Sequence, residues 1–160
     1  MPANIEIKAR VRDAERIRLI AEKLSNAPAE TIEQHDTFFA CPNARLKLRQ
    51  FSPDAGELIF YSRPDVAGTK QSNYVIAPTS APSELLAVLS AAFGVQRTVT
   101  KTRVLFRVGQ TRIHLDSVQG FGNFVELEVV LRDVGQTSFA IDQHAVTIIA
   151  PYRVVFTRHW

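Results

Sequence analysis

Polar and apolar residues alternate along most of the chain, which is the pattern of strands with one buried face. In residues 4–11, one face carries Ile5, Ile7, Ala9 and Val11. The same period of two predicts further strands near residues 32–40, 44–51, 57–63, 73–77, 96–108, 110–118, 122–132 and 152–157. The tract from Ser52 to Gly56 predicts a hairpin turn, and residues 63–71 are expected to form a loop.

Two segments have helical spacing instead. The first begins after Asp13, a residue type that caps helix N-termini, and runs to about Ser25. The second is expected from Pro82 to Gly94, because proline favours the first turn of a helix and glycine the position after the last. A short helix is also expected around residues 138–145. Many antiparallel strands and few helices predict an α+β fold, an antiparallel β-barrel with helices packed outside it.

The composition is that of an ordinary globular domain. The chain has 160 residues, of which 46% are hydrophobic and 22% charged, so we expect a single domain over residues 1–160. The one cysteine, Cys41, excludes an intramolecular disulfide and a cysteine-rich zinc site. No apolar run approaches the roughly 20 residues of a membrane helix. The N-terminus does not have the apolar core of a secretory signal, so we expect a cytoplasmic protein with no membrane partner.

The polar faces of the expected strands are strongly biased in charge. The basic residues that share faces are Arg45, Lys47 and Arg49, and then Lys101, Arg103 and Arg107. The other charged faces carry Glu6 with Lys8, Glu126 with Glu128, and Arg112 with His114 and Asp116. One such face is typical of a solvated sheet, whereas five together favour a charged interior or cleft.

A charged interior of this kind favours the binding of a polyanionic ligand and a metal ion. Buried charges are costly unless they are paired, and arginine and lysine recognise phosphate oxygens. Carboxylates supply the oxygen ligands that Mg²⁺ prefers, and Mg²⁺ also bridges to phosphate. Basic residues for phosphate and carboxylates for a divalent ion are the chemistry of phosphoryl or nucleotidyl transfer.

An ordered series of motifs resembles the CYTH superfamily, the triphosphate tunnel metalloenzymes. It begins at residues 4–8, Asn-Ile-Glu-Ile-Lys, which are similar to the motif E-x-E-x-K. It continues through His35–Phe39, Ala44–Arg49, Glu57–Pro64, Lys101–Arg103, Thr111–Asp116 and Gly120–Glu128. The order of these pieces over nearly the whole chain is more specific than any one of them, and it is most similar to the branch of the class IV adenylyl cyclases.

The resemblance implies an eight-stranded antiparallel barrel that forms a tunnel, with a triphosphate and Mg²⁺ or Mn²⁺ bound inside it. It implies that the metal is held by Glu6, Asp116, Glu126 and Glu128. It implies that the triphosphate path is lined by Lys8, Arg45, Lys47, Arg63, Lys101, Arg103 and Arg112, with Arg49, Lys70 and Arg107 as weaker candidates. Two departures stand out. Asn4 replaces the first glutamate of the motif, and the C-terminal segment, which bears on how the tunnel closes, is shorter than is usual in the family.

Two reactions fit such a site, and the sequence leaves the choice open. In one, the ribose 3′-hydroxyl of ATP attacks the α-phosphorus to give cyclic AMP and pyrophosphate. In the other, water attacks the γ-phosphorus of an organic triphosphate such as thiamine triphosphate. The candidate catalytic base is Lys47 or Lys101, or else a metal-bound water.

The alternative function is a non-catalytic module that binds a nucleotide or polyphosphate, and Asn4 and the shortened C-terminal segment motivate it. Nucleic acid is disfavoured as a partner, because the acidic residues on the same strands would repel its backbone. The sequence leaves the oligomeric state open, a homodimer included.

Overall fold

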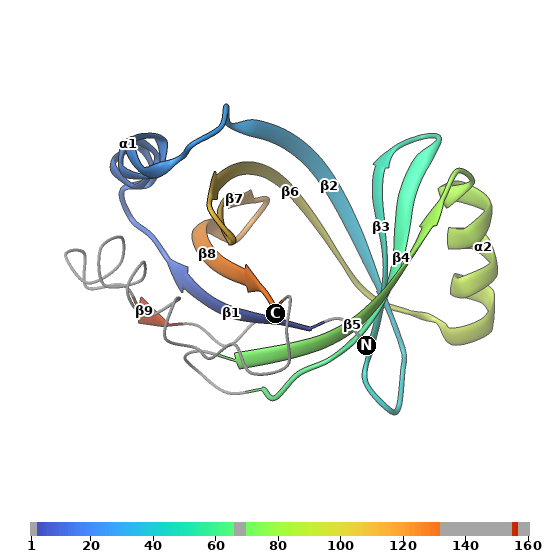
Figure 1. Cartoon of the computed structure of the whole chain (residues 1–160). Helices are drawn as coiled ribbons and strands as arrows, with labels where there is room; N and C mark the ends of the chain where they lie inside the picture. The colour runs from blue at the N-terminus through green and yellow to red at the C-terminus, as the bar shows by residue number, and fades with distance from the viewer. Residues whose placement is uncertain (1–2, 66–69, 132–154, 157–160) are drawn as a thin grey trace.

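In the computed structural model, which describes residues 3–65, 70–131 and 155–156, eight antiparallel strands close into a barrel and two helices pack outside it (Figure 1). The barrel strands are β1 (Ala3–Arg10), β2 (Glu30–Phe39), β3 (Arg45–Ser52), β4 (Ala55–Ser62), β5 (Lys70–Thr79), β6 (Val95–Val108), β7 (Thr111–Val118) and β8 (Gly122–Val130). The other elements are α1 (Ala14–Leu24), α2 (Pro82–Phe93) and β9 (Val155–Phe156), which pairs with the end of β1.

The sheet closes because β1 pairs with strands on both of its sides. The order around the barrel is β1-β5-β4-β3-β2-β6-β7-β8, and β8 pairs with β1 again. Across this closure Asn4 of β1 lies opposite Ser72 of β5 on one side and Val130 of β8 on the other. The barrel expected from the sequence is therefore confirmed. The expected helix around residues 138–145 and the shortened C-terminal segment lie outside the described residues.

Strand β5 begins earlier than the sequence predicts. The expected loop over residues 63–71 is wrong at its end, because Lys70 is already the first residue of the strand. Lys70 lies opposite Glu6 of β1, so this early start is part of the closure of the barrel. The first four residues of β5 are polar and give no alternating signal, and their pairing with β1 decides where the strand begins.

The two helices end where the sequence predicts. The Asp13 carboxylate caps α1 by accepting a hydrogen bond of 3.0 Å from the backbone N–H of Arg16. Helix α2 begins with Pro82 and ends at Gly94, which has a φ of 75° and so adopts a conformation that favours glycine. No helix of the described residues is both long enough and apolar enough to cross a membrane.

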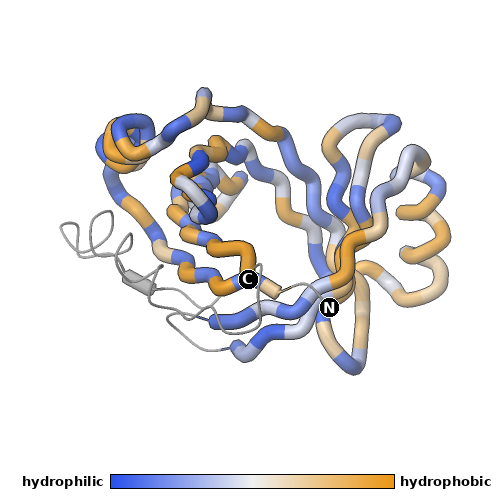
Figure 2. Tube along the Cα trace, in the orientation of Figure 1, coloured by the Kyte–Doolittle hydropathy of each residue, from blue (hydrophilic) through white to orange (hydrophobic). Residues whose placement is uncertain are grey.

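The hydrophobic core lies largely between the barrel wall and the helices. Ile17 and Ala21 of α1 pack against the outward apolar residues of β1, β7 and β8, and Leu89 of α2 packs against those of β2 and β3. Figure 2 shows the consequence along the chain, because hydrophobic and hydrophilic positions alternate on the strands. Outward residues thus supply much of the core, and inward residues are left to carry charge.

Candidate active site inside the barrel

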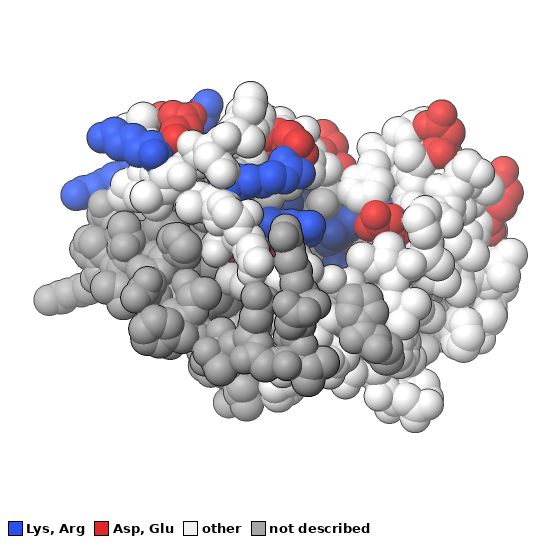
Figure 3. Space-filling view, in the orientation of Figure 1, with Lys and Arg blue, Asp and Glu red and all other residues white. Residues whose placement is uncertain are grey.

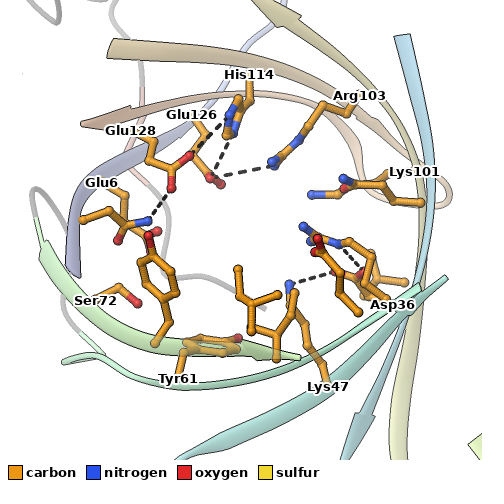
Figure 4. Close-up of a pocket in the computed structure, with 18 of the residues that line it drawn as sticks. Glu6, Asp36, Lys47, Tyr61, Ser72, Lys101, Arg103, His114, Glu126 and Glu128 are labelled. Atoms are coloured by element: carbon orange, nitrogen blue, oxygen red, sulfur yellow. Dashed lines mark hydrogen bonds and ion pairs between the residues drawn. The ribbon is translucent and has the colours of Figure 1, made fainter. Parts of the chain in front are cut away.

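Inward-facing residues of all eight barrel strands line a cavity of about 320 Å³. Since side chains alternate along a strand, every second residue points to the barrel interior. Figure 4 looks into this cavity, with the labelled glutamates on one side and the labelled lysines, together with Asp36, on the other. Figure 3 shows basic side chains within a hollow of the molecular surface.

The inward-facing residues form three groups, and we name each by its residues. The apolar floor consists of Phe38, Ile59, Tyr61, Val99, Val118 and Phe124. The charged belt consists of Glu6, Lys8, Asp36, Lys47, Arg49, Lys101, Arg103, His114, Asp116, Glu126 and Glu128. A second apolar group of the lining consists of Ile32, Phe51, Tyr74, Ile76 and Leu105. Two of its members, Tyr74 and Ile76, lie opposite Tyr61 and Ile59 of the apolar floor.

One wall of the charged belt is an aspartate that holds two cations. Asp36 of β2 lies opposite Arg49 of β3. The Arg49 guanidinium donates to both carboxylate oxygens, from Nε at 2.8 Å and Nη2 at 2.7 Å, and Lys47 Nζ donates at 2.9 Å. Burial raises the pKa of Asp36, but the charges of Lys47 and Arg49 outweigh it and hold this pKa well below its usual range. Asp36 is therefore ionised, and the trio keeps an excess of positive charge.

The neighbouring wall repeats this arrangement with Asp116 of β7. Arg103 donates to it from Nε at 2.6 Å and Nη2 at 2.8 Å, and Lys101 Nζ donates at 2.9 Å. Burial raises the pKa of Asp116, but Arg103 and Lys101 hold it well below its usual range. The Asp116 side chain is fully buried and does not line the cavity. Asp116 lies behind Lys101 and Arg103, which do line the cavity, and it holds their side chains in place through hydrogen bonds. Its contact with a metal ion stays a prediction.

The two lysines of these walls lose their protons more readily than free lysine. Burial and the neighbouring Arg49 lower the pKa of Lys47 to about 8. Burial and Arg103 also lower the pKa of Lys101, well below its ordinary value. An amine with a lowered pKa can act as a general base near neutral pH, which is the role that the sequence analysis gives to these two residues.

The other side of the belt holds three carboxylates. Glu6 of β1 lies opposite Glu128 of β8, and Glu126 is the next inward residue of β8. Burial and the negative charge of Glu126 raise the pKa of Glu6. Arg63 Nη1 donates a hydrogen bond to Glu6 Oε1, and Lys8 Nζ lies 3.5 Å from Glu126 Oε2. The negative charges of these glutamates thus lie close together, and a bound cation would stabilise them.

Asn4 belongs to this acidic side. Its Nδ2 donates a hydrogen bond to Glu128 Oε1. Its Oδ1 is buried and has no hydrogen-bond partner among the described residues. Leaving a buried amide oxygen unpaired costs free energy, which a ligand could recover. Compared with the motif glutamate, Asn4 therefore lacks the negative charge but still offers a side-chain oxygen that could bind a metal ion.

His114 lies between two of the carboxylates and was not selected by the sequence analysis. Its Nδ1 is 3.3 Å from Glu126 Oε1, and its Nε2 is 3.4 Å from Glu128 Oε2. Burial and the charge of Arg103 lower the pKa of His114. The sequence signal that could have identified His114 is its position on the same strand face as Arg112. The spacing of the histidines in the sequence does not match that of metal ligands.

Two of the remaining basic candidates, Arg107 and Arg112, lie opposite each other on β6 and β7. Arg112 lines the cavity with a half-exposed side chain, and its Nη1 is 3.8 Å from Glu128 Oε2. Arg107 instead forms an exposed ion pair with Glu30, at 2.6 Å, and does not line the cavity.

Arg45 lies opposite Tyr61 of the apolar floor, whereas Lys70 lies opposite Glu6 of the charged belt. Arg45 does not line the main cavity; it borders a second pocket together with Arg97, and its Nη2 is 3.4 Å from Asp65 Oδ1. Lys70 is buried beside Glu6 at the start of β5, and not in a loop. The structure thus gathers around one cavity nine of the eleven site residues that the resemblance implies, and the weaker candidate Arg49 as well. The nine are Glu6, Lys8, Lys47, Arg63, Lys101, Arg103, Arg112, Glu126 and Glu128.

The donor chemistry of the acidic side fits a hard divalent cation. Glu6, Glu126 and Glu128 offer carboxylate oxygens, and Asn4 offers its unpaired Oδ1. Across residues 3–65, 70–131 and 155–156, no three His, Cys, Asp or Glu side chains are already gathered closely enough to hold a metal ion. The glutamates instead contact Arg63, His114 and other groups of the chain, so metal binding requires them to exchange these partners.

Comparisons with known proteins agree with this geometry. The sequence matches the CYTH domain over residues 2–149, so the chain belongs to the CYTH family. Proteins of this family bind triphosphates, are typically enzymes and generally use divalent metal ions. No curated protein matches the sequence at a significant level.

Solved structures share the fold. The PH1012 protein of Pyrococcus horikoshii OT3 superposes with a TM-score of 0.80 at 22% identity, covering 91% of this chain and 89% of that one. A candidate adenylate cyclase of Vibrio parahaemolyticus has a TM-score of 0.68 at 20% identity, covering 94% and 88%. HpAC1 of Hippeastrum, for which a dominant triphosphatase activity is reported, has a TM-score of 0.68 at 14% identity, covering 100% and 92%.

Proposed function

We propose that the chain is a divalent-metal-dependent enzyme that acts on a triphosphate, either by hydrolysis or by cyclisation of a nucleoside triphosphate. The observation that supports this most is the division of charge within one cavity. Basic walls built on Asp36 and Asp116 face a side of three glutamates. A triphosphate would neutralise the walls, and the metal that it carries would neutralise the glutamates.

In this proposal Arg49 and Arg103 hold phosphate oxygens. Each guanidinium binds its aspartate through Nε and Nη2, which fixes the plane of the group and leaves Nη1 as a further donor. A divalent cation held by Glu6, Glu126 and Glu128, with Asn4 beside them, would supply positive charge to phosphate oxygens. Fixed donors of this kind stabilise the charge that develops during phosphoryl transfer.

Lys47 or Lys101 accepts the proton of the attacking oxygen in this scheme. The lowered pKa of each amine makes its neutral form available near neutral pH. The attacking group is water in hydrolysis and the ribose 3′-hydroxyl in cyclisation. Which of the two occurs depends on where the triphosphate lies relative to these amines.

The test is a substrate panel of ATP, GTP, thiamine triphosphate and tripolyphosphate with Mg²⁺ or Mn²⁺, in which phosphate, pyrophosphate and cyclic nucleotide are scored separately. We expect one metal-dependent product pattern, and its loss in Glu126→Gln and Glu128→Gln. The exposed Glu84→Gln of α2 is the matched control and should keep full turnover. Metal-dependent turnover that survives both cavity variants would contradict the metal site.

A second candidate function is a non-catalytic module that binds a nucleotide or polyphosphate. The hydrogen bond from Asn4 to Glu128 favours it, because it occupies a carboxylate that would otherwise be available to a metal. A metal-dependent thermal shift with ATP or tripolyphosphate, without product after long incubation, would support this alternative. Product formation would exclude it.

A further inference from the structure

A second pocket lies beside the turn that joins β2 to β3. Its volume is about 240 Å³. The lining consists of Phe38, Phe39, Ala44, Arg45, Leu46, Asp65, Gln96 and Arg97. Among the described residues, Phe38 of the apolar floor is the only one that lines both this pocket and the main cavity. On β6, Val99 of the floor lies between Arg97 and Lys101 of the charged belt. Floor residues therefore separate the second pocket from the belt.

The lining of the second pocket carries an excess of positive charge. Its charged residues are Arg45, Arg97 and Asp65. Arg45 Nη2 is 3.4 Å from Asp65 Oδ1, but the Asp65 side chain is 59% exposed, and an ion pair so open to solvent stabilises little. Partial burial lowers the pKa of Arg97, and the charges of Arg45 and Arg63 add to this effect. A bound anion would relieve this repulsion between guanidinium groups.

The two guanidinium groups are held in place by aromatic rings and still have hydrogen bonds to donate. The guanidinium carbon of Arg97 is 4.4 Å from the ring centroid of Phe38, and that of Arg45 is 5.9 Å from the ring centroid of Tyr61. Arg45 Nη1 is buried and has no hydrogen-bond partner among the described residues. A buried donor that is left unpaired costs free energy, which an acceptor in the pocket would recover.

The size and the chemistry of the lining favour a small oxyanion that keeps a proton. The volume is below the roughly 300–1,000 Å³ of sites for drug-sized ligands. Guanidinium groups match the oxygens of phosphate, sulfate and carboxylate alike. Asp65 distinguishes among these anions, because a carboxylate repels a fully ionised anion and accepts a hydrogen bond from a protonated one. Inorganic phosphate keeps a proton at neutral pH, whereas sulfate and simple carboxylates do not.

We propose that the second pocket binds hydrogen phosphate, with Arg45 and Arg97 donating to its oxygens and Asp65 accepting a hydrogen bond from its hydroxyl group. This site goes beyond the proposed function and stands without it, because none of these three residues lines the main cavity. It also gives Arg45 a role separate from the triphosphate path that the family resemblance implies for it. The belt and the second pocket are then two anion sites on either side of floor residues.

The test is a titration of the isotope-labelled chain with potassium phosphate or potassium sulfate at pH 7 and constant ionic strength, followed through the NMR signals of the backbone amides. We expect phosphate to shift the signals of Arg45, Gln96 and Arg97 saturably, and sulfate to bind at least about tenfold more weakly. Arg97→Gln should weaken phosphate binding at this pocket by about tenfold or more, because a charge-assisted hydrogen bond is lost. Arg18→Gln, an exposed arginine of α1 that also pairs with a carboxylate, is the matched control and should leave the affinity unchanged.

A second variant tests the choice of phosphate over sulfate. Asp65→Asn removes the negative charge that repels sulfate, so the preference for phosphate should fall to about twofold or less. Asp54→Asn, in the exposed hairpin turn, is its control and should keep the preference. Because Arg97 and Asp65 are both exposed, neither substitution is expected to prevent folding.

The outcomes separate this inference from the proposed function. Shifts confined to amides of the charged belt, shifts that do not saturate, or equal effects of Arg97→Gln and Arg18→Gln would overturn the second pocket as an anion site. Equal affinities for phosphate and sulfate in the wild-type chain, or a preference that survives in Asp65→Asn, would overturn the assignment of hydrogen phosphate. The proposed function fails separately, on the substrate panel, because this titration measures no turnover.

Discussion

Two buried aspartates position four of the basic side chains that face the cavity. Asp36 and Asp116 each accept a bidentate arginine and a lysine from an adjacent strand. The cations could not remain buried at such close spacing without these carboxylates, because unpaired buried charge is very costly. The basic walls of the cavity therefore depend on these two aspartates for their stability.

Removing the charge of Asp36 should destabilise the fold. Asp36→Asn leaves Lys47 and Arg49 without a counter-charge, so we expect the free energy of unfolding to fall by about 3–5 kcal/mol in urea titrations at pH 7. Asp54→Asn, in the exposed hairpin turn, is the matched control and should change it by less than about 0.5 kcal/mol. Equal effects of the two substitutions would contradict the role given to Asp36.

The same variant has a defined dependence on pH. The folded-state pKa of Asp36 is depressed, so its contribution is present above the unfolded-state pKa of about 3.9 and is lost as pH falls toward the folded-state value. The difference in stability between the wild-type chain and Asp36→Asn should therefore narrow below about pH 4. A difference that stays constant into acid would show that the charge of Asp36 is not what stabilises the fold.

Lys47 should set the pH profile of turnover if it is the base. The neutral amine is the active form, so turnover should rise with pH and level off above the pKa of about 8. Lys47→Met should lower turnover by about 100-fold or more, since general bases typically contribute 10²–10⁴-fold. Lys23→Met, on the exposed last turn of α1, should have no effect. An unchanged rate or an unchanged pH profile in Lys47→Met would exclude Lys47 as the base.

At the scale of elements, the sequence predicts what local interactions decide. The alternation in β1 and the caps at Asp13 and Gly94 act within a few residues, and those elements lie where expected. The start of β5 depends on pairing with β1, far away in sequence, and was predicted too late. The same distinction between local pattern and strand pairing holds for the residues of the candidate site. Residues in charge-biased strands such as Lys101 were found by alternation, whereas Asp36 and His114 became site residues through the strands that lie beside them.

Gly56 shows how an element positions the site. A Cβ at this residue would lie 2.7 Å from the backbone oxygen of Arg49, which cannot move without shifting β3. Gly56→Ala should therefore cost about 1–3 kcal/mol of stability and weaken the binding of a non-cleavable bismethylene analogue of tripolyphosphate. Gly120→Ala, in an open turn with a φ of 77°, carries backbone strain without this clash. It should reduce stability and leave that affinity unchanged, and a loss of affinity in both variants would point to general destabilisation.

At the scale of the whole molecule, barrel closure brings together charges that no single element could gather. Glu6, near the N-terminus, lies opposite Glu128 where β1 pairs with β8, while the basic walls come from β2, β3, β6 and β7. Without a ligand, these charges are balanced by contacts within the chain, such as Arg63 with Glu6 and Lys8 with Glu126. A triphosphate and a metal ion would replace those contacts together, because either one alone leaves one side of the belt uncompensated.

Ligand binding should therefore stabilise the fold cooperatively. Tripolyphosphate analogue and Mg²⁺ added together should raise the melting temperature by more than the sum of their separate effects. At a free ligand concentration of about 100 times the Kd, the stabilisation is roughly 2.7 kcal/mol, which corresponds to about 5–10 °C for a domain of this size. The double variant Glu126→Gln with Glu128→Gln should keep the shift due to the analogue and lose the additional shift due to Mg²⁺. Equal shifts with and without Mg²⁺ in the wild-type chain would show that the two sides of the belt act independently, and would contradict a shared metal and triphosphate site.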